Sequence, residues 1–197
     1  MAEEKQSVRA FVSIHVPAGV REQLREVQAE LERSIPKSAV RWTPFEQLHL
    51  TLEFLGNVAT ETLPPLENAL KRVASAHRPF ELSAERVGAF SSIRSPRVIW
   101  AGIEGEIDAV KALQAEVKNS VKLFVSEQET RAYRPHVTLG RVRPMKGRDL
   151  RRVSDALAAA TARAFGSWLV DAFALMQSKL SPHGPQHSTL ATFPLGG

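Results

Sequence analysis

Residues Arg41–Asn57, RWTPFEQLHLTLEFLGN, contain a four-residue pattern that the chain repeats. Its centre, His49-Leu50-Thr51-Leu52, returns in the second half of the chain as His136-Val137-Thr138-Leu139. Successive side chains of a β-strand point to opposite faces, so each histidine shares a face with the threonine two positions later. The aliphatic residues take the other face. Each copy therefore predicts a strand with a polar pair on an apolar backing.

The elements around the two motifs repeat in the same order. In the first half, period-2 and helical patterns predict strands over 8–16, 40–43, 47–55 and 80–90, with helices over 20–35 and 63–73. The second half predicts strands over 97–103, 136–142, 168–176 and 189–194, with helices over 107–121 and 150–157. We therefore expect an α+β fold with two duplicated lobes, each an antiparallel sheet backed by helices, and a central cleft between the motif strands.

A polar turn over residues 91–96 separates the two repeats. The chain has 197 residues, of which 43% are hydrophobic and 24% charged, a composition that predicts a folded core. We expect one bilobal domain over residues 1–197, with the junction between its lobes near residues 91–96. Because the two repeats can form a cleft within one chain, we also expect a monomer.

The composition excludes several classes of site and location. The absence of cysteine excludes disulfides, thiolate nucleophiles, cysteine-ligated zinc and iron–sulfur clusters. The N-terminal residues lack the apolar segment of a signal peptide, and no later run approaches the roughly 20 apolar residues that span a bilayer. We therefore expect a cytoplasmic protein without a membrane segment. The formal charge of +5 suits a phosphate-bearing partner, and a solvated basic surface accounts for it equally well.

The repeated histidines suit paired acid–base catalysis. One imidazole can take a proton from a nucleophile while the other gives a proton to the leaving oxygen, both near neutral pH. The hydroxyls of Thr51 and Thr138 share the faces of His49 and His136, where they can donate hydrogen bonds to oxygens that gain charge in the transition state. A phosphodiester fits this set of groups best, with water attacking on one side and an alkoxide leaving on the other.

Candidates for substrate binding lie close to the motifs. Arg131 and Arg141 flank the second motif, and Arg141 falls on the face opposite His136 in a regular strand, so its use as a phosphate ligand needs a bend. For three aromatic residues the sequence is consistent with either stacking on a base or packing in the core, namely Phe11, Trp42 and Tyr133. For Phe54 core packing is favoured.

A basic run follows the second motif and is consistent with either steering of RNA or a solvated helix start. It consists of Arg141, Arg143, Lys146, Arg148, Arg151 and Arg152. Histidines outside the motifs, among them His15 and His187, have no repeated context and are interpreted as ordinary surface or core residues.

Other catalytic motifs are missing. The chain has no H-E-x-x-H, G-x-x-x-x-G-K-[ST], G-x-G-x-x-G or G-x-S-x-G, so a zinc hydrolase, a P-loop enzyme, a dinucleotide-binding enzyme and an α/β-hydrolase would each lack their residues. Two alternatives belong to other classes of protein. A two-histidine metal protein lacks a nearby set of carboxylate or cysteine ligands, and an RNA-binding module without catalysis would not need both histidines and both threonines.

Three phrases together resemble the two-histidine (2H) phosphoesterase superfamily: RWTPFEQLHLTLEFLGNV, RPHVTLGRV and the ending ALMQSKLSPHGPQHSTLATFPL. Within it the chain is most similar to the RNA 2′,3′-cyclic phosphodiesterases, also called LigT-like proteins or 2′-5′ RNA ligases. The likeness covers essentially the whole chain. It implies an enzyme of RNA processing that hydrolyses a 2′,3′-cyclic phosphate on RNA or a nucleotide to a 2′-phosphate, without metal or cofactor. Some members also join tRNA halves through a 2′-5′ linkage.

The resemblance also implies roles for single residues. His49 corresponds to the proton donor to the leaving O3′, His136 to the base that activates water, and Thr51 and Thr138 to the phosphate-binding threonines. Near the end of the chain His187 stands where the family usually has tyrosine. Neighbours in the superfamily act on other 2′-linked or cyclic nucleotides, such as 2′-5′ oligonucleotides, and these remain alternatives.

Overall fold

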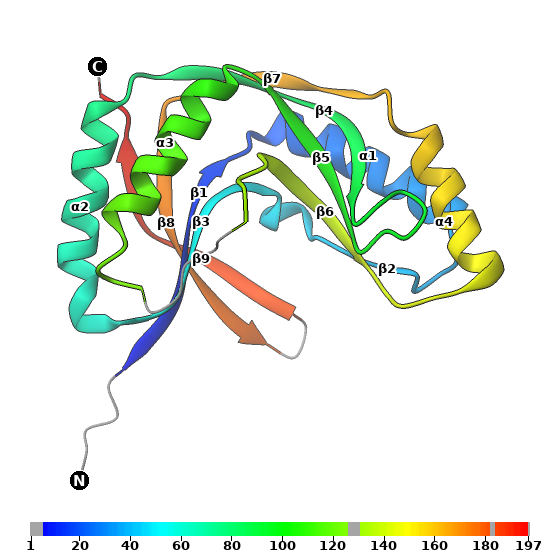
Figure 1. Ribbon diagram of the computed structural model, residues 1–197, viewed down its shortest axis with the longest axis horizontal. Coiled ribbons are helices and arrows are strands. Elements are labelled where there is room, and N and C mark those ends of the chain that lie inside the picture. Colours follow the sequence, from blue (N-terminus) through cyan, green and yellow to red (C-terminus); the bar gives the residue numbers. More distant parts are fainter. Residues whose placement is uncertain (1–5, 126–130, 182–183, 197) are drawn as a thin grey trace, which may run out of the picture.

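The computed structural model describes residues 6–125, 131–181 and 184–196. Its described strands form one nine-stranded antiparallel sheet in the order β7-β4-β5-β6-β3-β1-β8-β9, with β2 paired to β6 (Figure 1). The strands are β1 Ser7–His15, β2 Val40–Trp42, β3 His49–Ala59, β4 Phe80–Phe90, β5 Val98–Gly105, β6 His136–Val142, β7 Ala164–Val170, β8 Ala172–Ser181 and β9 Gly184–Pro194. The predicted α+β class is confirmed.

Helices cover the outer side of the curled sheet in two pairs. The α-helices are α1 Ala18–Ser34, α2 Leu63–Ala76, α3 Ile107–Ser120 and α4 Gly147–Ala159, and the short 3₁₀ helices are η1 Phe45–Gln47 and η2 Thr60–Thr62. Helices α2 and α3 pack on the half of the sheet that contains β3, β8 and β9, whereas α1 and α4 pack on the half that contains β4 and β7 (Figure 1). None of the helices within the described ranges is long and apolar enough to cross a membrane.

The two halves of the sheet do not coincide with the two halves of the chain. Residues 91–96, expected as the junction between lobes, form the turn between β4 and β5, which are neighbours in the same half of the sheet. The last strands, β8 and β9, return to the other half, where β8 pairs with β1. Each half of the sheet is therefore built from both halves of the chain.

Some predicted strand boundaries were wrong, among them the start of the last strand, which was predicted at residue 189 and lies at Gly184. The segment predicted as one strand over 168–176 is two strands that separate at Asp171, because β7 pairs with β4 while β8 pairs with β1 at the far side of the sheet. The first motif strand does not end before Gly56. Gly56 takes a φ of +68°, which glycine adopts without strain, and β3 continues to Ala59.

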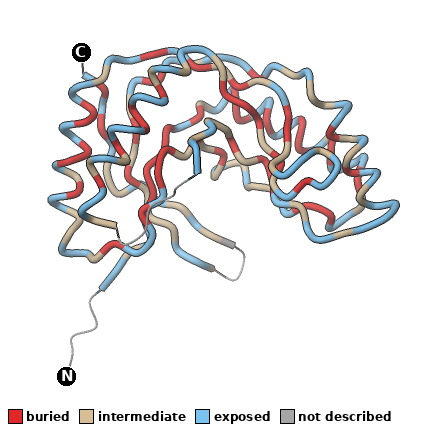
Figure 2. Tube along the Cα trace, viewed as in Figure 1, coloured by how far each residue is buried: buried red, intermediate tan, exposed pale blue. Residues whose placement is uncertain are grey.

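The core lies between the sheet and its helices. The aliphatic residues between the polar motif positions are almost fully buried there, with Leu50, Val137 and Leu139 each 0% exposed. Figure 2 shows the buried residues gathered where the helices meet the strands. Each such side chain contributes about 1.5–3 kcal/mol relative to an exposed position. The apolar backing of the motifs thus anchors the polar pairs on the opposite, helix-free face.

Gly88 and Gly102 provide room for the indole ring of Trp100. A Cβ added at Gly88 would lie 2.2 Å from that ring, and one added at Gly102 would lie 3.4 Å from it. We expect Gly88→Ala to lower the free energy of unfolding by about 1–3 kcal/mol, because the ring cannot stay in place beside the new methyl group.

Denaturant-induced unfolding monitored by far-UV circular dichroism measures this change. The matched control is Gly19→Ala in α1, since a Cβ at Gly19 meets nothing within 4 Å. Because alanine is the better helix former, the control is expected to be neutral or slightly stabilising. A Gly88→Ala protein as stable as the control would contradict the close packing of Trp100.

Candidate active site

The two motif strands meet at the centre of the sheet. Strand β3 begins at His49 and β6 begins at His136, and the strands pair antiparallel through Leu50 and Val137. Because Leu50 and Val137 face the helices, the histidines and threonines on either side of them face the concave side. The pairing therefore brings the two His-x-Thr motifs together across one face.

Each motif histidine is held by a carbonyl two residues before it. The Nδ1 atom of His49 lies 2.7 Å from the carbonyl oxygen of Gln47, and the Nδ1 atom of His136 lies 2.7 Å from that of Arg134. A carbonyl oxygen only accepts hydrogen bonds, so Nδ1 carries the proton in both rings. The Nε2 atom of each ring is thereby left to accept or give a proton.

The surroundings of both rings favour the neutral imidazole. Burial, and the nearby His187 and His136, lower the pKa of His49 to about 4, against the opposing effect of the Gln47 carbonyl. Burial and the Arg141 guanidinium lower the pKa of His136, against the effect of its bond to Arg134. Both histidines are thus neutral at pH 7 in the free protein, and a bound anion would raise both pKa values.

A bulge in β6 brings Arg141 to the catalytic face. Trp100 pairs with Thr138 and Ile99 with Gly140, so Leu139 is an extra residue in β6. The pairing then continues with Val98 opposite Arg141. Since Val98 and Trp100 share a face of β5, Arg141 shares the face of Thr138. The bulge supplies the bend that a regular strand would lack, and the guanidinium lies near enough to His136 to lower its pKa.

Strand β3 also contains a bulge. Ser13 pairs with Thr51 and Val12 with Glu53, so Leu52 is the extra residue. The bulge turns Phe54 toward the face of Thr51, where it is 59% exposed. The prediction that Phe54 packs in the core was wrong, because a period-2 pattern does not include the bulge.

The other aromatic candidates lie in different surroundings. Phe11 is 3% exposed and its ring stacks on that of His49, with ring centres 5.0 Å apart. The hydroxyl of Tyr133 donates a hydrogen bond to the Thr51 carbonyl at 3.1 Å, which ties the loop before β6 to the first motif strand. Burial and the nearby Glu53 raise the pKa of Tyr133. Phe11 thus packs against the ring of His49, and Tyr133 holds the backbone at Thr51.

The remaining two candidates are Trp42 and Arg131. The ring of His49 contacts those of Phe11 and His187. Trp42 pairs with Gly140, and a Cβ at Gly140 would lie 3.0 Å from its indole. Gly140 is opposite the buried Ile99, so Trp42 lies toward the helix side of the sheet. Arg131 is exposed in the loop before β6. The structure therefore gathers the two histidines, the two threonines, Phe11 and Arg141.

Sequence reasoning missed two residues at this site. Phe90 of β4 has its ring 4.7 Å, edge to face, from that of His136. The other is His187. It lies on β9, with its ring 4.9 Å from that of Phe11 and 5.5 Å, edge to face, from that of His49. Burial lowers its pKa. The β8–β9 hairpin is held beside the first motif by Gln47, whose Nε2 donates to the Pro185 carbonyl at 2.5 Å. The one signal in the sequence was its place at a position where the resembling family usually has tyrosine.

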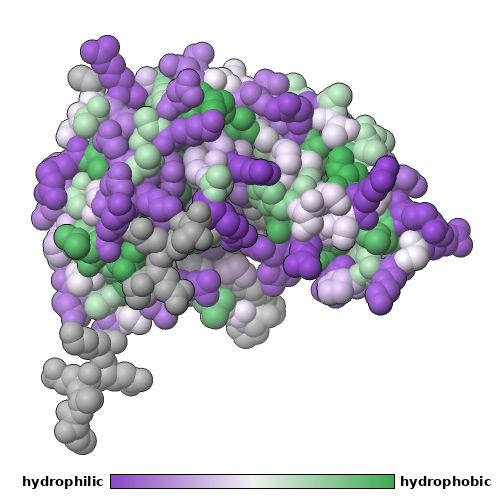
Figure 3. All heavy atoms as spheres, in the orientation of Figure 1, coloured by the Kyte–Doolittle hydropathy of each residue, from purple (hydrophilic) through white to green (hydrophobic). Residues whose placement is uncertain are grey.

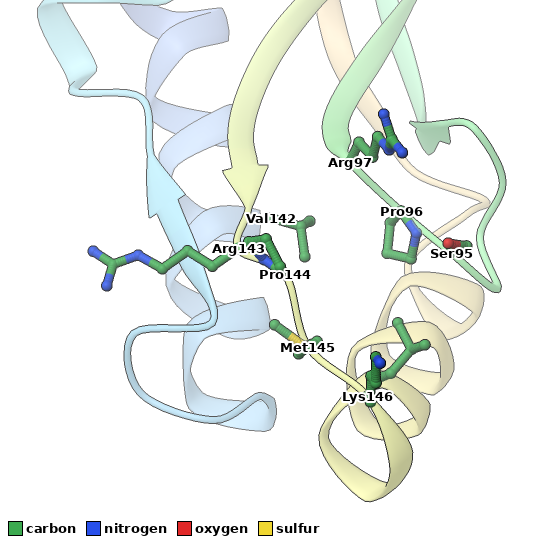
Figure 4. A pocket seen from close by; sticks show the side chains of 9 residues that line it. Ser95, Pro96, Arg97, Val142, Arg143, Pro144, Met145 and Lys146 are labelled. Atoms are coloured by element: carbon green, nitrogen blue, oxygen red, sulfur yellow. The ribbon is translucent and has the colours of Figure 1, made fainter.

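A cavity of about 680 Å³ lies between the β4–β5 turn and the segment that joins β6 to α4. Figure 4 shows Arg97 and Pro96 at the β4–β5 turn, Val142 and Met145 on the segment that leaves β6, and Lys146 just before α4, while the side chain of Arg143 extends away from the turn. Hydrophilic residues cover the neighbouring α4 end of the molecule (Figure 3), where Arg148, Arg151 and Arg152 are exposed. This basic pocket lies beyond the C-terminal end of β6, past Arg141.

A second cavity, of about 290 Å³, opens beside His49 over β1, β8 and β9. Its lining includes Ser13, His15 and His187. Among the described residues no three His, Asp, Glu or Cys side chains gather into a group that could hold a metal ion.

Comparisons with known proteins find a family and relatives that match most of the chain. The family model described as LigT like Phosphoesterase matches residues 14–100 and 102–187. The RNA 2′,3′-cyclic phosphodiesterase of Archaeoglobus fulgidus is 33% identical over 186 residues, 94% of this chain and 99% of the relative. The enzyme of that name from Thermus thermophilus is 32% identical over 197 residues, 96% of this chain and 91% of the relative.

Solved structures share the fold. A Thermus thermophilus crystal structure superposes with a TM-score of 0.79 at 30% identity, covering 96% of this chain and 98% of that one. Escherichia coli LigT complexed with 3′-AMP superposes with a TM-score of 0.75 at 27% identity, covering 96% of this chain and 99% of that one.

Proposed function

The chain belongs to the LigT-like phosphoesterase family, and we propose from this premise that it hydrolyses the 2′,3′-cyclic phosphate at the end of an RNA to a 2′-phosphate. Water adds to phosphorus, the bond from phosphorus to O3′ breaks, and O3′ leaves as a hydroxyl. The observation that carries the proposal is the pair of imidazoles on adjacent strands, each with Nδ1 bound to a carbonyl and Nε2 left for proton transfer.

Within this reaction His136 takes a proton from the attacking water and His49 gives a proton to O3′. Thr51 and Thr138 donate hydrogen bonds to the non-bridging oxygens, and Arg141 compensates their negative charge. In the free protein the low pKa values leave both rings neutral. The anionic substrate raises them, so a proton taken up with the substrate supplies the imidazolium that the leaving oxygen needs.

The reaction is tested by incubating the protein with uridine 2′,3′-cyclic phosphate in the presence of EDTA and separating 2′- from 3′-phosphate product. Formation of the 2′-phosphate supports the proposal. Formation of the 3′-phosphate would contradict it, because the other bond to phosphorus would have been broken.

We also propose that the same site can join RNA ends. If a ribose 5′-hydroxyl takes the place of water opposite O3′, the product is a 2′-5′ phosphodiester instead of a 2′-phosphate. An RNA that ends in a cyclic phosphate, incubated with a second RNA bearing a 5′-hydroxyl, would then give a longer product whose junction resists nucleases specific for 3′-5′ linkages.

The pH dependence of the reaction follows from the two lowered pKa values. The pKa of His49 is about 4, and that of His136 lies below the ordinary 6.5. Catalysis needs one proton on the pair, a form that is most populated between the two apparent pKa values and is lost as the pH rises above them. We therefore expect kcat/KM, which reports the free enzyme, to be greatest between about pH 4 and 6.5 and to fall above that range.

The profile of kcat provides the comparison for this prediction. It reports the substrate complex, in which the phosphate raises both pKa values, so its maximum is expected at a higher pH. Initial rates at constant ionic strength, with circular dichroism at each pH to verify the fold, measure both profiles. A kcat/KM maximum above pH 7 would contradict the neutral state of the histidines in the free enzyme.

The basic pocket predicts a preference for RNA over mononucleotides. Val142, on its lining, lies about 20 Å from His136 along β6, at about 3.3 Å per residue, which only a substrate of several nucleotides can span. Arg97 and Lys146 lie across this pocket from each other and can contact backbone phosphates. We expect the double variant Arg97→Gln/Lys146→Gln to lower kcat/KM on a ten-nucleotide cyclic-phosphate RNA by about tenfold at low salt, without changing turnover of a cyclic mononucleotide.

The matched control removes the same number of charges from the other half of the molecule. Lys71 on α2 and Lys111 on α3 are exposed, and Lys71→Gln/Lys111→Gln is expected to leave both activities unchanged. Rates measured across a salt series should fall less steeply for the Arg97/Lys146 variant than for the wild type. An equal loss on RNA and on the mononucleotide would contradict a role in binding the backbone.

A further inference from the structure

Each repeat carries a buried glutamine in the helix that precedes its motif strand. The residues around it repeat as well, as Val27-Gln28-Ala29-Glu30-Leu31 in α1 and Leu113-Gln114-Ala115-Glu116-Val117 in α3. Gln28 is 7% exposed and Gln114 is 8% exposed. A polar side chain is rarely buried to this degree unless it is hydrogen-bonded, so its partners indicate its role.

The amide of Gln28 bonds to the bulge of β6. Its Nε2 atom donates to the carbonyl oxygen of Leu139 at 2.8 Å and to that of Thr43 at 2.9 Å, which accounts for both hydrogens of the amide. Leu139 is the extra residue of the bulge, and its carbonyl also accepts from the backbone N–H of Thr43 at 2.9 Å. Gln28 thus ties α1 to the bulge and to the segment after β2.

Gln114 makes the corresponding contact in the other half of the sheet. Its Nε2 atom donates to Oε2 of Glu53 at 3.0 Å, and Glu53 directly follows Leu52, the extra residue of the β3 bulge. Each glutamine therefore reaches the motif strand of the other repeat, from α1 to β6 and from α3 to β3. Because the same crossed contact occurs beside both bulges, the glutamines are more than isolated polar residues in the core.

The β6 bulge decides where Arg141 lies. A bulge leaves its extra residue without a partner in the ladder, and the strand regains regular pairing if its register shifts by one residue. Such a shift would return Arg141 to the face opposite Thr138. The bonds from Gln28 oppose the shift, because movement of the Leu139 carbonyl would leave a buried amide with an unmet hydrogen bond.

We propose that Gln28 is a positioning residue for catalysis, which fixes the β6 bulge and thereby holds the Arg141 guanidinium on the face of His136 and Thr138. The proposal rests on the proposed function, in which Arg141 compensates the charge of the non-bridging oxygens. Gln28 lies between α1 and the sheet, so it acts through the strand and not by contact with the substrate.

The first test replaces Gln28 by methionine, which has a similar length and no N–H group. Gln28→Met is expected to lower kcat/KM for uridine 2′,3′-cyclic phosphate by about tenfold, because a displaced binding group weakens contacts in the transition state. Arg141→Ala removes the guanidinium itself and is expected to cost about thirtyfold, the order of magnitude for loss of one hydrogen bond to a charged group.

The double variant decides whether the two residues act through the same interaction. In the Arg141→Ala background, Gln28→Met is expected to cost no more than about twofold, because the contact that it would weaken is already gone. A full tenfold loss in that background would overturn the proposal.

The pH profile separates positioning from a merely structural role. Burial, the Arg134 carbonyl and the Arg141 guanidinium set the pKa of His136, and only Arg141 lies beyond the bulge. Because a nearby cation disfavours the imidazolium, displacement of Arg141 in Gln28→Met raises the pKa of His136. The fall of kcat/KM at high pH is therefore expected to occur at a higher pH than in the wild type.

The matched control is Val27→Ala, which removes two methyl groups from a buried neighbour of Gln28 in α1. It is expected to lower the melting temperature without any shift of the pH profile. An unshifted profile in Gln28→Met, or an equal shift in both variants, would overturn the proposal.

Two further measurements do not depend on turnover. In the wild type, the side-chain amide hydrogens of Gln28 are expected to exchange with solvent much more slowly than those of exposed Gln23 on the same helix, as measured by NMR. Equal exchange would overturn the proposal even if Gln28→Met does not fold. A wild type that hydrolyses no cyclic phosphate would overturn the proposed function alone, and the affinity for inorganic phosphate would then replace kcat/KM in the comparison of Gln28→Met, Arg141→Ala and the double variant.

Discussion

Replacement of either motif histidine by alanine is expected to lower kcat/KM for uridine 2′,3′-cyclic phosphate by about a hundredfold to ten-thousandfold. The reason is that each imidazole carries one of the two proton transfers, and a positioned general acid or base contributes rates of that order. The two losses should not multiply. Once His49 is absent, the unprotonated O3′ limits the rate, so loss of His136 as well is expected to cost much less than it does alone.

Initial rates of the His49→Ala, His136→Ala and double variants measure these effects. The matched control is His77→Ala, because the His77 ring binds Glu116 at 3.1 Å on the helix side, away from the motif strands. Circular dichroism and the melting temperature establish that each variant folds. If either motif variant retains more than about a tenth of the wild-type rate, paired-histidine catalysis is wrong, since loss of a general acid or base costs more than that.

The hydroxyls of Thr51 and Thr138 carry the second large effect. Valine has nearly the same shape as threonine and keeps the strand preference, so Thr51→Val and Thr138→Val each remove one hydrogen-bond donor with little change in packing. We expect kcat to fall by about a hundredfold to a thousandfold for each variant, because charge on the non-bridging oxygens is greatest in the transition state. KM should change much less, since the substrate in its ground state depends less on these bonds.

The control for the threonine variants is Thr60→Val, whose hydroxyl bonds the Gln6 carbonyl at 2.8 Å on the surface. It is expected to keep the wild-type kcat. The variants also separate two roles for the hydroxyls. A rise in KM at unchanged kcat would show that Thr51 and Thr138 bind the substrate without stabilising the transition state.

Much of the local structure could be predicted from the sequence. The alternation of Val12 and Ile14 with Ser13 and His15 predicted β1, and the spacing of Leu24, Val27 and Leu31 predicted α1, because each side chain's face depends only on its place in a regular element. The prediction that His49 shares a face with Thr51, and His136 with Thr138, follows from the same period.

Features that depend on the partner strand could not be predicted in this way. The faces of Phe54 and Arg141 depend on the bulges at Leu52 and Leu139, which exist only in the register with β1 and β5. A period-2 reading assigned both residues to the opposite face. His187 was missed for a related reason, since its approach to His49 requires the β8–β9 hairpin to pair onto β1.

The sequence by itself determined the elements, the repeated polar pairs and the family, because these depend on short-range periodicity and on residue identity at fixed spacings. The tertiary structure alone decided which half of the sheet each element joins. Helix α1, from the first half of the chain, packs on the half of the sheet with β7, and α3, from the second half of the chain, packs on the half with β3. The tertiary structure also decided that the indole of Trp100 lies over Gly88 while Ser13 and Ala174 line a cavity beside His49. Contacts between strands far apart in the chain set these features, and such contacts leave no period in the sequence.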